Sequence, residues 1–152
     1  MEKIEIAREL ASKMLDFLEP KAEISVELKD GRLRLNAEVA EAGFLIGHDG
    51  ENLKALQHVL GLMISKKIGE PLNSFNFVFD INNYQKERED YLIALAKNTA
   101  YRVLETKKDI ELNPMSATER KIVHLTIEKI EGVKSESLGE GEERRVVIKP
   151  VE

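Results

Sequence analysis

The sequence predicts an α+β protein made of two small domains, residues 1–82 and 83–152. In some segments apolar residues recur every three or four positions, and in others they alternate, which indicates both helices and strands. The pair Asn82-Asn83 separates a strand pattern from a long helical pattern, so we place the joint there. The chain has 152 residues, 42% of them hydrophobic, which is enough for one ordinary core or two small ones.

The first domain is predicted to begin with an amphipathic helix, because apolar residues from Ile4 to Leu18 keep helical spacing and Pro20 follows as a stop. Between Glu23 and Glu38 the pattern changes to alternation. Asp30-Gly31 lies in the middle of this stretch and predicts a tight turn between two antiparallel strands. The remaining elements, in order, are a short helix within 40–46, a helix over 51–67 and a strand over 75–81.

Gly47, His48, Asp49 and Gly50 form a GxxG loop between the apolar run 43–46 and the next helix. Two glycines allow a tight turn and a close approach by another backbone, and the helix start presents free N–H groups to a phosphate. A GxxG pair alone is weak evidence in a chain with 9 glycines. The alternative is an ordinary turn into a helix, but the apolar flanks favour a nucleic-acid-binding loop.

The second domain is predicted to open with a long helix from Tyr84 to the basic pair Lys107-Lys108. Ser116 and Glu119 form a capping box that opens a further helix, with Gly132 beyond its end. The domain therefore combines helices with short strands. The strands are expected at 109–112, 133–138 and 144–149, with a turn at 139–141 between the last two.

Arg120 and His124 stand four residues apart on the capped helix and so project from one face. They fall at the edge of its apolar arc, where side chains are half-buried, oriented and accessible. An arginine can grip phosphate oxygens, and a histidine can stack on a base or donate a hydrogen bond to it. For an isolated pair, the alternative is a surface ion pair and a core histidine.

The segment Arg120–His124 resembles the R-three-H motif, an arginine and a histidine separated by three residues, with which its family binds single-stranded nucleic acid. The flanking segments 111–115 and 137–150 agree with this resemblance. The GxxG loop within the order helix-strand-strand-helix-helix-strand is similar to a type II KH domain. A type II KH domain followed by an R-three-H domain resembles the bacterial Jag family, also called SpoIIIJ-associated or KhpB proteins, and the match covers the chain from its first helix onward.

This resemblance implies an RNA-binding protein of the bacterial cytoplasm that is not an enzyme and needs no cofactor. Single-stranded RNA is the expected partner, with single-stranded DNA as the alternative. Leu56 is expected to help shape the groove beside the loop. Because alternate residues of a strand face opposite ways, only one of Arg144 and Arg145 is expected at the site. The nucleic-acid-binding residues implied are Ile46, Gly47, His48, Asp49, Gly50, Leu53, Arg120, His124, Arg144, Arg145 and Lys149.

The chain departs from the family pattern in two ways. Many members carry a further N-terminal domain, whereas this sequence begins at the KH helix. KH loops usually hold a basic residue, whereas this loop has His48-Asp49. Asp49 is predicted to cap the following helix and occupy the positive end of its dipole, which weakens phosphate binding. Protonation of His48 is predicted to tighten binding through the loop between pH 8 and pH 6.

The composition excludes several classes of protein. A net charge of −5 argues against a sequence-blind phosphate binder, so nucleic-acid contacts must be local, and the second half is less acidic than the first. The absence of cysteine excludes disulfides and thiolate metal sites. No apolar run reaches the roughly 20 residues of a membrane helix, so no direct membrane insertion is expected.

Two different functions compete with RNA binding through both domains. An enzyme is disfavoured because no P-loop, metal-ligand cluster or acid/base pair is fixed by spacing. The stronger rival is a protein-interaction adapter. Its acidic first half would dock a partner KH protein, membrane-insertase machinery or a second copy, and RNA would contact only Arg120 and His124.

Overall fold

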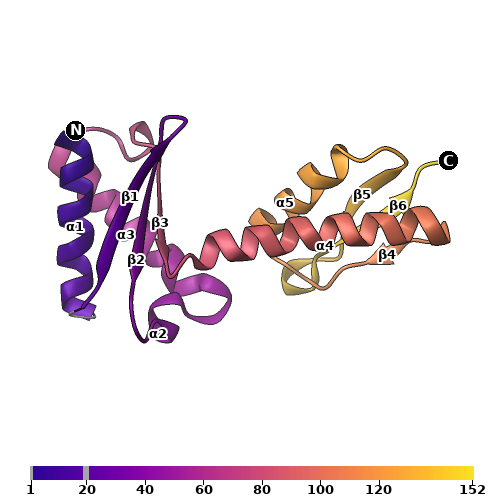
Figure 1. Cartoon of the computed structure of the whole chain (residues 1–152), viewed down its shortest axis with the longest axis horizontal. Helices are drawn as coiled ribbons and strands as arrows, with labels where there is room; N and C mark the ends of the chain where they lie inside the picture. The colour runs from indigo at the N-terminus through magenta and orange to yellow at the C-terminus, as the bar shows by residue number, and fades with distance from the viewer. Residues whose placement is uncertain (1, 19–20) are drawn as a thin grey trace. The chain divides into compact units, whose positions relative to one another are not determined.

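The computed structural model describes residues 2–18 and 21–152. The chain divides into two compact units, one up to Lys86 and the other from Glu87 onward. Each unit has its own hydrophobic core and a three-stranded sheet (Figure 1). The boundary falls in the first turn of α4 (Tyr84–Thr106), the helix that directly follows the predicted joint at Asn82-Asn83.

The first unit begins with α1 (Glu2–Leu18), and the proline predicted to stop it, Pro20, lies outside the described residues. The predicted hairpin is confirmed as β1 (Glu23–Lys29) and β2 (Arg32–Glu38), which pair antiparallel. Asp30 and Gly31 turn the chain with φ angles of 53° and 75°, the positive values that a tight hairpin turn requires. β3 (Phe77–Ile81) lies parallel to β2, so the sheet order is β1-β2-β3.

The core of the first unit forms between one face of this sheet and the helices α1 and α3 (Glu51–Ile68). Leu33, Leu35 and Phe79 fill it and are fully buried. Phe17, which we counted in the apolar pattern of α1, is instead 92% exposed. At about 100° per residue it lies off the stripe of buried α1 residues, in which Leu15 takes part. The short elements are α2 (Gly43–Ile46), η1 (His48–Gly50) and η2 (Leu72–Ser74).

A buried carboxylate joins the end of β3 to the start of α4. Asp80 is fully buried, and it accepts hydrogen bonds from the backbone N–H groups of Gln85 at 3.0 Å and Lys86 at 3.3 Å. Arg34 from β2 pairs with the same carboxylate. Asn82-Asn83 make the turn with φ angles of 51° and 56°. Asp80 therefore satisfies first-turn donors of α4 from a neighbouring strand.

The second unit places α4 and α5 (Ala117–Glu128) against one sheet, because core residues of both helices pack with Val146 and Ile148. The predicted capping box is confirmed, with Ser116 and Glu119 each accepting from the other's backbone N–H at 3.3 Å. Among the described residues, no helix is both long and apolar enough to span a membrane. The strands, in the order β4-β6-β5, are β4 (Ile110–Glu111), β6 (Arg145–Pro150) and β5 (Val133–Leu138), with η3 (Gly141–Glu143) between β5 and β6.

Candidate nucleic-acid interface

The GxxG loop links α2 to α3 through backbone conformations that favour glycine. Gly47 has φ 73° and ψ −178°, a region that is essentially restricted to glycine. Asp49 and Gly50 follow with φ angles of 52° and 77°, both left-handed. The two glycines therefore fix the path of the loop, and their spacing in the sequence is explained by this backbone geometry.

Asn52 ties the two helices together beneath the loop. Its amide donates a hydrogen bond of 2.6 Å to the backbone oxygen of Phe44 in α2. A Cβ atom added to Gly47 would lie only 2.7 Å from the Asn52 Cγ, so the absence of a side chain at Gly47 makes room for this bond. Sequence reasoning missed Asn52, and the only available signal was a short amide side chain in the first turn after Gly50.

The prediction that Asp49 caps α3 is wrong. The helix begins at Glu51, so Gly50, in the left-handed conformation, is the N-cap residue, and within the described part of the chain no side chain caps the first turn. Asp49 sits one residue too early, and its carboxylate lies 3.3 Å from His48 Nε2 with both side chains largely exposed. The first-turn N–H groups of α3 are therefore not covered by the Asp49 carboxylate.

The apolar residues around the loop differ in what they can contact. Leu53 is fully buried in the core, so it supports the loop and has no surface to offer a ligand. Ile46 and Leu56 are half-buried. Phe44, one helical turn before the loop, is 57% exposed. The accessible apolar surface beside the loop thus comes from α2 and the first half of α3.

In the second unit, His124 is held by two serine hydroxyls of β5. Its Nδ1 lies 2.7 Å from Ser135 Oγ, and its Nε2 lies 2.8 Å from Ser137 Oγ. The two serines share one face of the strand because they are two residues apart. Both ring nitrogens are already hydrogen-bonded. Of the two contacts predicted for His124 with a base, stacking through the ring face is therefore still available, whereas a hydrogen bond from the ring is not. Sequence reasoning missed the serines, although the alternation in 133–138 could have indicated them.

Two arginines set the electrostatic environment of His124. Arg120 donates a hydrogen bond of 2.8 Å to the Met115 carbonyl, and Arg144 donates one of 2.7 Å to the Gly139 carbonyl. Partial burial lowers the pKa of His124, the charges of Arg120 and Arg144 lower it further, and Glu128 opposes them. The lowered pKa keeps the ring neutral at neutral pH.

Arg145 and Lys149 are engaged elsewhere. Arg145 lies 3.8 Å from the Glu111 carboxylate, and Lys149 lies 3.0 Å from that of Glu136, a hydrogen-bonded contact that raises the pKa of Lys149. On β6 both alternate with Val146 and Ile148, which pack beneath the helices, so they belong to the opposite face of the sheet. Of the predicted basic support, Arg144 is the residue whose charge acts on His124.

Comparison with known proteins defines the class of the second unit. Residues 90–150 match the R-three-H domain family, so this unit is an R-three-H domain, and the matched range includes Arg120 and His124. Over most of its length the chain is also similar to full proteins. It is 32% identical over 144 residues to the RNA-binding protein KhpB of Clostridium symbiosum, covering 93% of this chain and 64% of that protein.

Two further relatives agree. The chain is 35% identical over 130 residues to the RNA-binding protein KhpB of Bacillus subtilis (strain 168), covering 84% of this chain and 61% of that protein. It is 31% identical over 135 residues to that of Streptococcus pneumoniae (strain ATCC BAA-255 / R6), covering 89% and 40%. Over most of its length the chain is therefore similar to KhpB proteins, the Jag family that its motifs resemble. It spans about two-fifths to just under two-thirds of the length of these relatives.

Proposed function

We propose that this chain binds single-stranded RNA in the bacterial cytoplasm without catalysing a reaction. The contacts would be made by the loop Gly47–Gly50 and by the Arg120/His124 site. The observation that carries the proposal is the arrangement at His124, a neutral ring that is hydrogen-bonded to two serines and whose pKa is lowered by the charges of Arg120 and Arg144. The names of the relatives, all RNA-binding proteins, support RNA as the ligand.

We further propose that the first unit is a type II KH domain, with the domain division at Asn82-Asn83. Its element order, α1-β1-β2-α2-α3-β3, with the GxxG loop between α2 and α3, supports this assignment. In such a domain the loop clamps the backbone of about four nucleotides of an extended strand. Here backbone N–H groups of the loop would meet the phosphates, since the loop offers no lysine or arginine.

At the R-three-H site, the two arginines and the histidine would divide the work. Arg120 and Arg144 would attract the phosphates, and each keeps guanidinium donors beyond the one bonded to a carbonyl. The His124 ring would stack on a base, since its nitrogens are occupied by Ser135 and Ser137. Arg145 and Lys149 would not take part.

This division predicts a shallow salt dependence. Two arginines at the R-three-H site and no lysine or arginine in the loop correspond to about two neutralised phosphates. For a single strand, the slope of log K against log salt is then about −1.4. Replacement of Arg120 by alanine should reduce the slope by about 0.7. A slope several times steeper would place a larger basic surface in the complex.

The test is fluorescence anisotropy of a labelled random single-stranded RNA with the full chain. The R-three-H variant carries Arg120→Ala and His124→Ala. The loop variant is His48→Glu, which puts a negative charge on an exposed side chain without straining the backbone. Its matched control is His58→Glu, the same substitution at an exposed position of α3. Circular dichroism checks that each variant is folded.

We expect both site variants to lose affinity at least tenfold, while His58→Glu binds like the wild type. Loss in the R-three-H variant alone would make the first unit an interaction module, as the adapter hypothesis requires. A wild-type chain that binds neither RNA nor single-stranded DNA would contradict the proposed function.

A further inference from the structure

The strand β1 forms an open edge of the first sheet. Within the sheet order β1-β2-β3, β1 pairs only with β2 among the described strands, over seven residues from Glu23 to Lys29. The N–H and C=O groups along its outer side are thus available to another strand, a feature that proteins either protect or use for association. Leu28 on this strand is 60% exposed, although its alternate neighbours Ile24 and Val26 pack against the core.

The two ends of the hairpin carry opposite charges. At one end Glu23 is the direct cross-strand partner of Glu38, and at the other Lys29 is the partner of Arg32. Like charges directly opposite each other destabilise a strand pair. In the part of the chain that the structure describes, none of these four exposed side chains takes part in an ion pair. Neither end is therefore closed by an ion pair within the described part of the unit.

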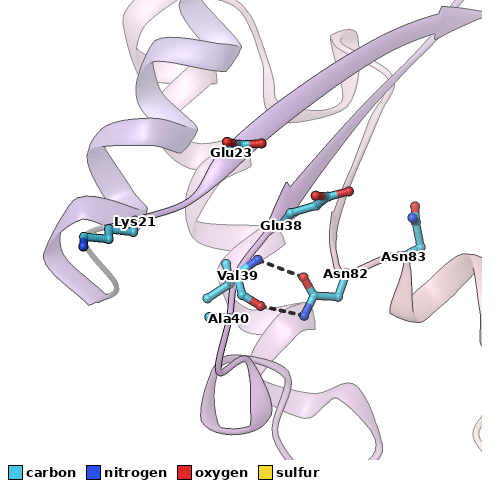
Figure 2. Close-up of a pocket in the computed structure, with 7 residues that line it drawn as sticks. All are labelled: Lys21, Glu23, Glu38, Val39, Ala40, Asn82 and Asn83. Atoms are coloured by element: carbon cyan, nitrogen blue, oxygen red, sulfur yellow. Dashed lines mark hydrogen bonds between the residues drawn. The ribbon is translucent and has the colours of Figure 1, made fainter.

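The acidic end is also open. Figure 2 shows Glu23 and Glu38 on neighbouring strands beside a hollow of about 530 Å³ that Lys21 and Asn83 also line. The residues that line this hollow include none of those assigned to the GxxG loop or the R-three-H site. It leaves space next to the Glu23 carboxylate for a side chain that comes from outside the unit.

We propose that β1 pairs with β1 of a second copy of this chain, antiparallel and centred on Val26. A two-fold axis through Val26 places each β1 residue opposite the residue of the second copy that lies the same number of positions from Val26 in the other direction. Both copies then use the same surface, as in any isologous contact. At each end of the paired strands, Glu23 of one copy then lies opposite Lys29 of the other. Glu38 and Arg32, their partners on β2, lie beside these pairs. Between them, Ile24 meets Leu28, so the exposed leucine gains an apolar neighbour.

The charge pattern favours a second copy over a different protein, because the edge is complementary to itself. The same antiparallel pairing that satisfies the carboxylates at one end satisfies the cations at the other. The hydrogen bonds would join the two three-stranded sheets into one, with all four apolar side chains of Ile24 and Leu28 on the helix-covered face. This association goes beyond RNA binding and does not depend on it.

The test uses two single charge reversals, Glu23→Lys and Lys29→Glu. Each one removes a like-charge contact inside the hairpin, with Glu38 or with Arg32, so neither should lower the melting temperature. Each one creates two like-charge contacts in the dimer. Sedimentation velocity over a concentration series, on protein freed of nucleic acid, should show a wild-type dimer and about a tenfold weaker association for either variant.

Mixing the two variants is the decisive step. In a mixed dimer, the lysine introduced by Glu23→Lys meets the glutamate introduced by Lys29→Glu, and the native contact between Glu23 and Lys29 is kept at the other end. Association should therefore return to the wild-type level. A control matched to Lys29→Glu, Lys97→Glu, makes the same charge change at an exposed position of α4 and should associate like the wild type. A monomeric wild type, or a mixture no stronger than its components, would overturn the proposal.

Discussion

Replacement of Gly47 by alanine tests the geometry of the GxxG loop. The residue has φ 73° and ψ −178°, a conformation whose occupation by a non-glycine residue costs about 1–3 kcal/mol. The new Cβ would also lie 2.7 Å from Asn52 Cγ and 2.8 Å from its Nδ2. Either the Asn52–Phe44 bond breaks, at about 0.5–1.5 kcal/mol, or the backbone moves.

We therefore expect Gly47→Ala to destabilise the first unit by about 1.5–4.5 kcal/mol, the sum of these two costs. Differential scanning calorimetry of the full chain should show this as a fall of at least about 6 °C in the transition of that unit. The matched control is Gly43→Ala, four residues earlier. Its Cβ would meet nothing within 4 Å, so the change should stay within about 0.5 kcal/mol.

A double-mutant cycle separates the clash from the backbone strain. In an Asn52→Ala background the contacts with Asn52 Cγ and Nδ2 are gone and only the 3.0 Å contact with its Cβ remains, so Gly47→Ala should cost about 1 kcal/mol less than in the wild type. If the stability changes of Gly47→Ala and Asn52→Ala simply added in the double variant, the Asn52 side chain would not contact the new Cβ. A Gly47→Ala variant as stable as Gly43→Ala would refute the loop conformation itself, and with it the explanation for the first glycine of the motif.

The remaining predictions concern charge and hydrogen bonding. Because the pKa of His124 is lowered in the folded chain, the unfolded chain binds more protons below about pH 6.5. Stability of the second unit should therefore be complete above that pH and decline as the pH falls, a decline that His124→Gln should reduce in urea titrations at several pH values. Ser135→Ala and Ser137→Ala should each cost about 1 kcal/mol in the same experiment. Asp80→Ala should cost about 3–5 kcal/mol in the first unit, since it removes a buried ion-pair partner, and calorimetry with an unchanged transition would contradict that role.

Much of the fold could be predicted because local rules and tertiary packing agree. The turn Asp30-Gly31 and the capping box at Ser116 depend on residues close in sequence, and both are present. The cap predicted for Asp49 is wrong because the left-handed Gly50 lies between Asp49 and the first residue of α3. The path of the backbone from α2 into α3 sets that conformation. Local propensity alone does not specify such a junction.

The candidate sites were predictable only in part, for the same reason. The spacing of Arg120 and His124 placed them on one helix face, but their partners come from other elements. The His124 ring is fixed by Ser135 from β5, and the loop is fixed by Asn52 bonding back to α2. The choice of Arg144 over Arg145 likewise required the register of β6 against its neighbours. Contacts of this kind join elements that sequence periodicity does not connect.

The most direct test of the central claim is an NMR titration of the ¹⁵N-labelled chain with a short single-stranded RNA. Binding through both motifs predicts that amide signals of Gly47, Gly50 and Asn52 shift together with those of His124 and Ser137. Signals of β1 should stay in place. If only the loop signals or only the R-three-H signals shifted, RNA would contact one unit alone. A saturating titration that shifts neither set of signals would contradict the account.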